Sequence, residues 1–405
     1  MIFNRYRTMP LSRSTLVAIM VFLLALPAIC HAQNLNAAKI HNSNFCDTIP
    51  FEYVKNKIIV KLTIENKERR FILDTGAPLL ISEQLRAELN LKSKHKIETT
   101  DVTGRSNDIP VVKMPEIQFG NVSFSNAQAL VYDLSASGLL QCFAVDGLLG
   151  STILKHCIVQ IDLEKKWIIL TDRIENFRVL PDERMALAFD KNSRPFLDIK
   201  IAESTPFRVL FDSGSDKLLA LSYLTYSELN KKREAKALYK GKGSVSSGLF
   251  GAGKEGEELI ILLNQLEIGP GILDSIVTNV SENKNKNAIG MPVGKFGIIT
   301  LDYLHKHFYF HPYQTRQIVT NGNFYGFDSQ LVNDDYIASV VYEGSNAEKA
   351  GLKRGDIILQ INEYKVDEFK DICQLFFGNY FTGESLNLTV KDKDNNIKTV
   401  KIAKE

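Results

Sequence analysis

Two segments of this 405-residue sequence share one unusual pattern, and the repeat limits the fold more than any other feature. Residues 70–82 read RFILDTGAPLLIS, and residues 208–222 read RVLFDSGSDKLLALS. Each has an apolar run, an Asp, a hydroxyl residue, a Gly and a second apolar run, and Asp74 and Asp212 are 138 residues apart. One such motif often arises by chance, so further matches are needed before a duplication is inferred.

Further matched segments follow each Asp motif in the same order. DGLLGST at 146–152 corresponds to AIGMPVG at 288–294, and IVQIDLEKKWIIL at 158–170 corresponds to IITLDYLHKHFYF at 298–310. The offset stays close to 140 residues throughout. A matched series at nearly constant offset predicts a duplicated unit.

The residues around each motif indicate the local structure. Apolar residues alternate at 57–64 and 196–201, which predicts a strand before each motif. Ser82 and Ser222 precede helix-like stretches, and serine is a preferred N-cap residue. The remainder of both units has short apolar runs separated by Gly, Asn and Pro, so we expect mainly β structure.

A carboxyl group from each unit suits one kind of chemistry. Two carboxyl groups about 3 Å apart share one proton, because ionising both is costly. The ionised group can then deprotonate water while the protonated group hydrogen-bonds a carbonyl under attack. Glycine after each motif lets the backbone turn sharply, and the hydroxyl residues can brace one loop against the other. The candidate catalytic residues are Asp74 and Asp212, supported by Thr75, Gly76, Ser213 and Gly214.

On these residues the chain resembles the pepsin- and retropepsin-like aspartic proteases, and more closely the bacterial exported aspartyl-protease-like proteins with a C-terminal PDZ domain. The resemblance implies two pseudo-symmetric β-barrel lobes in one chain, at 33–184 and 185–318, and a PDZ domain at 319–405. It implies an aspartic endopeptidase acting on peptides or proteins without a cofactor or metal. Because one chain carries both lobes, we expect a monomer.

Two hairpins are expected to cover a bound peptide, at 99–110 and at 241–256, where six of 16 residues are Gly. Ordinary surface loops are the alternative. The first hairpin lacks the Tyr or Trp of pepsin-like enzymes, and Asp216 stands where the family usually has an uncharged residue; we expect Asp216 to point outward. These departures keep a second function open, that of a catalytically inactive peptide-binding protein using the cleft and the PDZ groove.

Residues 336–366 carry the PDZ resemblance, with a Gly-Ser turn, a short helix and a Gly-Asp before an apolar strand. In circularly permuted bacterial PDZ domains a peptide C-terminus adds as a strand beside a helix, here expected at 367–377. Its carboxylate is held by an apolar-Gly-apolar loop, which matches Tyr325, Gly326 and Phe327. The alternatives are a PDZ domain that only packs against the lobes, or one that inhibits the cleft.

The N-terminus has the order of a secretory signal peptide over residues 1–32. Arg5, Arg7 and Arg13 precede an apolar run at 15–30, and Cys-His-Ala precedes Gln33. A run of 16 residues is short for a span of about 20, so we expect cleavage, no transmembrane span afterwards, and export to the periplasm, cell surface or medium. A lipoprotein signal at Cys30 is less favoured, because Ile29 is a poor match before it.

Charge and cysteine content narrow the function further. Without the three leader arginines, 46 basic side chains face 47 acidic ones, so no global charge favours nucleic acid or anionic lipid. Beyond the leader the four Cys residues, Cys46, Cys142, Cys157 and Cys373, allow two disulfides in an exported protein. Cys142 and Cys157 could pair, and buried free thiols are the alternative. The run of His305, His307 and His311 is expected around a β-turn and not at a zinc site.

Overall fold

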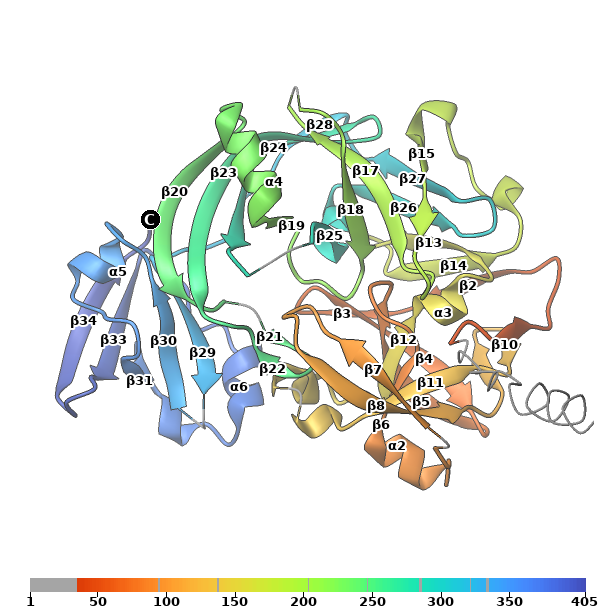
Figure 1. Cartoon of the computed structure of the whole chain (residues 1–405), viewed down its shortest axis with the longest axis horizontal. Helices are drawn as coiled ribbons and strands as arrows, with labels where there is room; N and C mark the ends of the chain where they lie inside the picture. The colour runs from red at the N-terminus through yellow and green to blue at the C-terminus, as the bar shows by residue number, and fades with distance from the viewer. Residues whose placement is uncertain are drawn as a thin grey trace, which may run out of the picture. The chain divides into compact units, whose positions relative to one another are not determined.

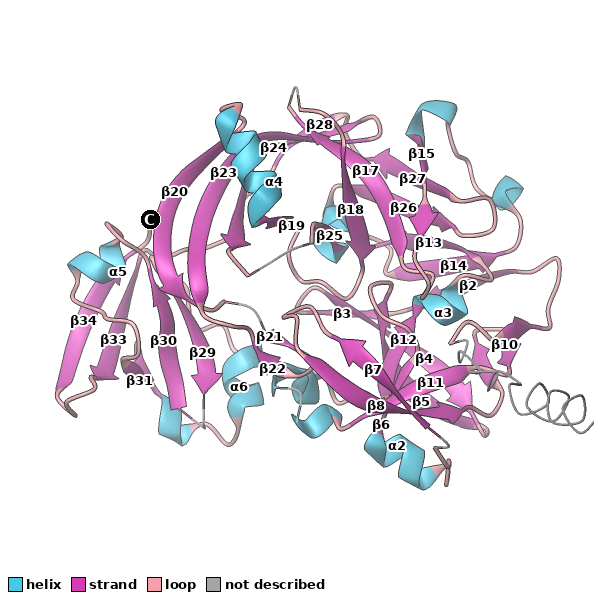
Figure 2. Cartoon of the chain, in the orientation of Figure 1, coloured by secondary structure: helices cyan, strands magenta, loops and turns pink. Residues whose placement is uncertain are grey.

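The computed structural model describes residues 35–405 except 94, 137, 203, 246, 284–285, 321 and 333–334. The expected signal peptide and Cys30 lie outside the described residues. Strands dominate the described chain, so the predicted mainly β fold is confirmed (Figure 2). None of the helices in the described part is long and apolar enough to cross a membrane.

The first Asp motif lies within an 11-stranded sheet. The order of its central strands is β4 (Lys57–Ile64), β5 (Lys67–Asp74), β12 (Gly147–Gly150), β6 (Leu80–Ser82), β11 (Gln128–Tyr132), β8 (Ser106–Lys113) and β7 (His95–Thr100). Beyond β4 come β9 (Ile117–Phe119), β10 (Val122–Ser125) and β1 (Lys39–Ile40), and β3 (Glu52–Val54) also pairs with β4.

The second Asp motif has the same surroundings in a nine-stranded sheet (Figure 1). Its strands run β17 (Pro195–Ile201), β18 (Phe207–Asp212), β25 (Ala288–Gly290), β19 (Leu219–Ser222), β24 (Gly271–Ser281), β23 (Gly256–Ile268) and β20 (Ala235–Gly243), with β16 (Ala188–Phe189) and β28 (Arg316–Ile318) at the sides. In both sheets the strand ending in Asp pairs in parallel with the strand ending in Gly, so Asp74 faces Gly150 and Asp212 faces Gly290.

A six-stranded sheet joins the two repeats. Its order is β15 (Arg184–Ala186), β27 (His307–Pro312), β26 (Gly297–Asp302), β13 (Ile158–Asp162), β14 (Trp167–Thr171) and β2 (Cys46–Pro50). The strands β13 and β26 hold equivalent segments of the two repeats and pair antiparallel with each other. Gln160 and Thr300 occupy equivalent positions, face each other in this pairing and are joined by a 3.0 Å hydrogen bond.

One hydrophobic core runs through both repeats and this joining sheet. Leu73 and Phe211, which immediately precede the two Asp, are both fully buried in it. Burying a Leu or Phe side chain stabilises a fold by about 1.5–3 kcal/mol. The apolar runs before the motifs therefore anchor the strand ends from which both Asp side chains project.

The serine N-caps predicted from the sequence are confirmed. Ser82 caps α2 (Glu83–Glu88) by accepting a hydrogen bond from the N–H of Leu85, and Ser222 caps α4 (Tyr223–Lys231) in the same way from Thr225. The two helices begin at equivalent places after β6 and β19, so the repeat extends beyond the strands.

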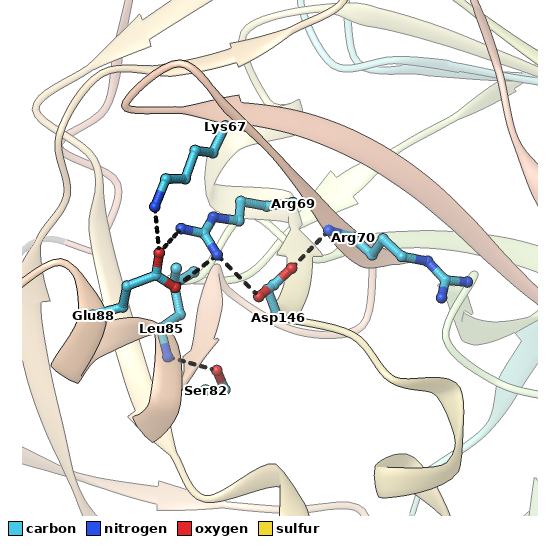
Figure 3. A network of polar contacts seen from close by, with 7 residues as sticks. All are labelled: Lys67, Arg69, Arg70, Ser82, Leu85, Glu88 and Asp146. Atoms are coloured by element: carbon cyan, nitrogen blue, oxygen red, sulfur yellow. Dashed lines mark hydrogen bonds and ion pairs between the residues drawn. The ribbon is translucent and has the colours of Figure 1, made fainter.

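A polar network fastens α2 and the start of β12 to β5 (Figure 3). The guanidinium of Arg69 contacts the carboxylate of Glu88 at 2.6 Å and that of Asp146 at 3.9 Å. Asp146 also accepts a hydrogen bond from the backbone N–H of Arg70, and Lys67 pairs with Glu88. Because Asp146 immediately precedes β12, these contacts help to fix the strand that lies beside Asp74.

The C-terminal residues form a separate sheet with its own core. The strand order is β29 (Phe327–Val332), β30 (Asp335–Val341), β31 (Ile357–Ile361), β33 (Ser385–Lys391) and β34 (Ile397–Ala403), with β32 (Tyr364–Lys365) beside β31. Two short helices, α5 (Asn346–Lys349) and α6 (Ile372–Phe377), accompany the sheet. The helix expected at 367–377 begins later than predicted, at Ile372, because Asp371 caps it.

The suggested Cys142–Cys157 pair is wrong. Cys142 forms a disulfide with Cys373 of α6, while Cys157 is a buried free thiol in the main core and Cys46 is an exposed one. Because the partners are 231 residues apart in sequence, local spacing carries no signal for this pairing. His305 lies in the turn between β26 and β27 as predicted and contacts Asp302, whereas His311 contacts Glu183.

Candidate active site

The six residues predicted from the repeat come together where β5 and β18 end. Asp74 and Asp212 are the last residues of these strands, and their side chains are in hydrogen-bond contact. Each carboxylate also accepts a hydrogen bond from its own loop, from the N–H of Gly76 at 2.9 Å and of Gly214 at 3.0 Å. The structure therefore juxtaposes one carboxyl group from each repeat.

The two glycines make this close approach possible. A Cβ atom on Gly76 would lie 2.6 Å from Cγ of Asp212, and one on Gly214 would lie 2.4 Å from Cγ of Asp74. Non-bonded carbon atoms do not approach so closely, so any other residue would push the opposite carboxyl group away. The requirement is reciprocal, because each glycine makes room for the Asp of the other repeat.

Thr75 and Ser213 lock the two loops to each other, and both are fully buried. The hydroxyl of Thr75 donates to the carbonyl of Phe211 at 2.7 Å and accepts from the N–H of Ser213 at 2.9 Å. Ser213 does the same in reverse, donating to Leu73 and accepting from the N–H of Thr75. Four hydrogen bonds thus fix one Asp-bearing loop relative to the other.

The environment of the Asp74–Asp212 pair favours its protonated form. Burial, followed by the charge of Asp212, raises the pKa of Asp74 to about 7. The ammonium group of Lys57 and the N–H of Gly76 act in the opposite direction. The pair therefore retains one shared proton to higher pH than an isolated carboxyl group would.

Lys57 is the residue at this site that the sequence did not reveal. It is the first residue of β4, and its Nζ donates a hydrogen bond to the carbonyl oxygen of Gly214 in the other repeat. In the sequence it is one lysine at the start of an alternating strand, which is a common surface position. Only the arrangement of the two repeats brings it beside the Asp pair.

Asp216 points outward, as expected. Its side chain is exposed, and its carbonyl oxygen accepts a hydrogen bond from Nδ2 of Asn56 at 3.2 Å. It therefore adds a surface charge to the loop and not a third carboxyl group to the pair.

Both segments predicted to cover a peptide are hairpins. Strands β7 and β8 pair around residues 101–105, and β20 and β23 extend into a tip where Ser247–Gly248 pairs with Gly251–Ala252. The tips meet, because the N–H of Phe250 donates to the carboxylate of Asp101 at 2.9 Å and the ring of Phe250 packs edge-on against Tyr132. The second hairpin thus reaches across to the first repeat.

The three residues predicted for carboxylate binding lie at the start of β29, the edge strand of its sheet: Tyr325 and Gly326 precede the strand, and Phe327 is its first residue. Tyr325 is buried and donates to the carbonyl of Gly383, Gly326 has φ +85°, and the side chain of Phe327 lies in the C-terminal core. The N–H of Glu405 donates to the carbonyl of Phe324, so the last residue of the chain lies beside this loop.

Comparisons with known proteins agree with this architecture. Residues 60–153 match the family model for aspartyl proteases, and residues 337–379 match a model for PDZ domains. Asp74 lies inside the first match, whereas Asp212 lies beyond it.

Two solved structures are similar at low identity. Basic 7S globulin from soybean is 11% identical, over 66% of this chain and 94% of that one, with a TM-score of 0.39. A retropepsin-like aspartic protease from Rickettsia conorii is 18% identical, over 33% and 92%, with a TM-score of 0.23. By the family matches, the chain is similar to aspartyl proteases over residues 60–153 and to PDZ domains over residues 337–379.

Proposed function

We propose that this protein is an aspartic endopeptidase in which the two repeats act as two lobes around one active site. The observation that carries the proposal is the contact between Asp74 and Asp212, each held by an N–H of its own loop. The reciprocal hydrogen bonds of Thr75 and Ser213 support it, because they preorganise both carboxyl groups.

The reaction follows from one proton shared by two carboxyl groups. The ionised carboxylate accepts a proton from a water molecule, which attacks the carbonyl carbon of the peptide bond. The protonated carboxyl group donates a hydrogen bond to the carbonyl oxygen, where negative charge develops. The raised pKa of Asp74 supports this division of roles, since it keeps a proton on the pair near neutral pH.

The remaining parts of the chain fit an enzyme that acts on extended peptides. The two hairpins supply a cover for a peptide lying over the Asp pair. A PDZ domain takes a peptide C-terminus as an added strand beside a helix, and we assign these parts to the edge strand β29 and to α6, with residues 325–327 at the peptide carboxylate. Export after removal of residues 1–32, and action as a monomer, complete the proposal.

The test is cleavage of a peptide library by residues 33–405, read by mass spectrometry from pH 3 to pH 9. We expect cleavage by the wild type and a loss of about 10²–10⁴-fold in Asp74→Asn and in Asp212→Asn. Asp216→Asn is the matched control, because it removes an exposed carboxylate from the same loop and should retain activity.

The outcomes separate the two functions that the sequence left open. Cleavage that survives both substitutions at the Asp pair would contradict the proposed mechanism. Binding of extended peptides without cleavage at any pH would instead favour the inactive peptide-binding protein. Thermal unfolding of each variant shows whether a loss of activity reflects a loss of folding.

A further inference from the structure

The turn before β4 crosses from the first repeat to the active-site loop of the second. Val54 of β3 pairs with Lys57 of β4, which leaves Lys55 and Asn56 as a two-residue hairpin turn. Both turn residues have positive φ, of 46° and 61°, as a tight turn of this kind requires. The conformation of this turn thereby fixes the backbone position from which the side chain of Lys57 extends.

Two successive residues of this hairpin hold the loop that follows Asp212. Asn56 donates from Nδ2 to the carbonyl of Asp216, and Lys57 donates from Nζ to the carbonyl of Gly214. Gly214 is also the residue whose Cα faces the carboxyl group of Asp74 and whose N–H binds Asp212. Lys57 thus binds the carbonyl group of Gly214, and Asp212 binds the N–H of the same residue. Gly214 therefore links the ammonium group to the Asp pair.

We propose that Lys57 is a positioning residue for peptide hydrolysis, which holds the Gly214 loop in place and stabilises the singly ionised state of the Asp74–Asp212 pair. The proposal rests on the proposed peptidase function. It extends that function, because it assigns a cationic residue to a site whose other members are two carboxyl groups and neutral hydrogen-bonding groups.

The proposed role of Lys57 depends on its positive charge. Lys57 is partly buried, and a positive charge near a buried carboxylate interacts far more strongly than it would in bulk water. Its presence favours the ionised member of the pair and opposes the effect of burial on Asp74. Without it, both protons of the pair would be released at higher pH.

Few other titratable groups face the pair. Tyr303 contacts Ser151 beneath the first Asp loop, and burial raises its pKa, so it stays neutral in the range of interest. Lys217 lies in the same loop as Asp212, but its Nζ donates to Asn279 of β24 at 2.7 Å. Among the described residues, Lys57 is the cation that acts on Asp74.

Four variants separate charge from structure. Lys57→Met removes the charge and the hydrogen bond, Lys57→Gln retains a donor for the Gly214 carbonyl without the charge, and Lys57→Arg retains both. Lys55→Met is the matched control, because it makes the same charge change at an exposed position two residues away. Circular dichroism and thermal unfolding establish that each variant is folded.

The first measurement is the pH profile of kcat/KM on a peptide that the wild type cleaves. We expect both limbs to move to higher pH, by about 1 unit, in Lys57→Met and Lys57→Gln. Lys57→Arg and Lys55→Met should keep the wild-type limbs. A uniform loss of rate with unmoved limbs in the two neutral variants would overturn the proposal and leave Lys57 with a structural role only.

A second measurement does not depend on cleavage. Carboxyl-¹³C NMR of Asp-labelled protein follows the titration of the pair, whose signals are assigned by their loss in Asp74→Asn and Asp212→Asn. The midpoints should rise in Lys57→Gln and not in Lys55→Met, and unmoved midpoints would overturn the proposal. If the wild type cleaves nothing, the proposed function fails while this titration still decides the role of Lys57.

Discussion

At the scale of single residues, the absence of a side chain is what permits the contact between the two carboxyl groups. Gly214 approaches the carboxyl group of Asp74 so closely that a Cβ would lie 2.4–2.7 Å from its atoms. Ser213 next to it is fully buried and hydrogen-bonded across the repeat, so the loop has little room to withdraw. Position 214 therefore has no room for a side chain.

Gly214→Ala should abolish most peptide cleavage while leaving the protein folded. The added methyl group must displace either the carboxyl group of Asp74 or the loop, at a cost of about 1–3 kcal/mol. Cleavage rates and thermal unfolding measure the two effects. Gly322→Ala is the control, because nothing lies within 4 Å of the position that its Cβ would take. Full activity of Gly214→Ala would contradict the close approach of Gly214 to the carboxyl group of Asp74.

The sequence predicted the residues of the Asp pair but not the charge beside them. The Asp motifs repeat, and a repeat is visible in one sequence without any structure. Lys57 has no such signature, since its contact depends on how the hairpin turn of one repeat lies on a loop of the other. The Cys142–Cys373 pairing escaped prediction for the same reason, because it joins two separately folded segments.

At the scale of elements, some glycines of the glycine-rich hairpin at 241–256 serve close packing and not mobility. Its composition predicts mobility, yet Gly241 and Gly243 lie where β20 packs on β30 of the PDZ domain. A Cβ on Gly243 would lie 2.1 Å from the carbonyl oxygen of Ser339. At these two positions glycine therefore serves close packing, and sequence alone does not distinguish this from flexibility.

The tip of this hairpin should be released when Asp101 is replaced. One carboxylate oxygen of Asp101 accepts from Thr103 within its own turn, and the other accepts from the N–H of Phe250 in the opposite hairpin. A hydrogen bond to a charged group contributes about 1.5–3 kcal/mol. We therefore expect at least about tenfold faster amide exchange over residues 247–252 in Asp101→Ala, measured by hydrogen–deuterium exchange.

Asp108→Ala provides the comparison, because it removes an exposed carboxylate from strand β8 of the same hairpin. Its exchange over 247–252 should equal that of the wild type. Equal exchange in Asp101→Ala and the wild type would mean that the tips do not hold each other in solution.

At the scale of the whole molecule, the PDZ domain is fastened to both repeats. The Cys142–Cys373 disulfide joins α6 to the first repeat, and Phe143 packs against Phe376 and Phe377 of the helix. Strand β30 packs on β20 of the second repeat. A displacement of α6 is therefore transmitted to the first repeat through this covalent bond.

Reduction should weaken this arrangement measurably. A reductant, or Cys373→Ser, should lower the free energy of unfolding by about 2–4 kcal/mol, because the cross-link no longer restricts the unfolded chain. Reductant should have no further effect on Cys373→Ser, whereas Cys46→Ser should respond like the wild type, since Cys46 is a free exposed thiol. Identical melting temperatures of the wild type with and without reductant would refute the link.

The junction between the second repeat and the PDZ domain contains two acids with raised pKa values, the fully buried Glu258 and the half-buried Asp328. Glu258 of β23 is fully buried, with the charges of Lys217 and Asp328 acting on it and Ser281 and Val245 beside it. Burial raises the pKa of Glu258 to about 7 and also raises the pKa of Asp328, whose carboxylate accepts from the hydroxyl of Tyr342. Both acids are thus held more readily in their protonated form.

Stability should therefore fall as the pH rises through neutrality. An acid whose folded pKa exceeds its unfolded value stabilises the fold fully below the unfolded value, near 4.5 for Glu258, and this stabilisation is lost as pH rises through about 7. A difference of this size corresponds to about 3 kcal/mol. Urea unfolding at pH 5 and pH 8.5 measures the dependence, to which the Asp pair and Asp328 also contribute; Glu258→Gln should lose the share of Glu258, whereas Glu116→Gln, at an exposed position, should keep the wild-type dependence. If Glu258→Gln retained the wild-type dependence, the junction would not be the source, and the Asp pair, whose pKa is also raised, would be the next group to replace.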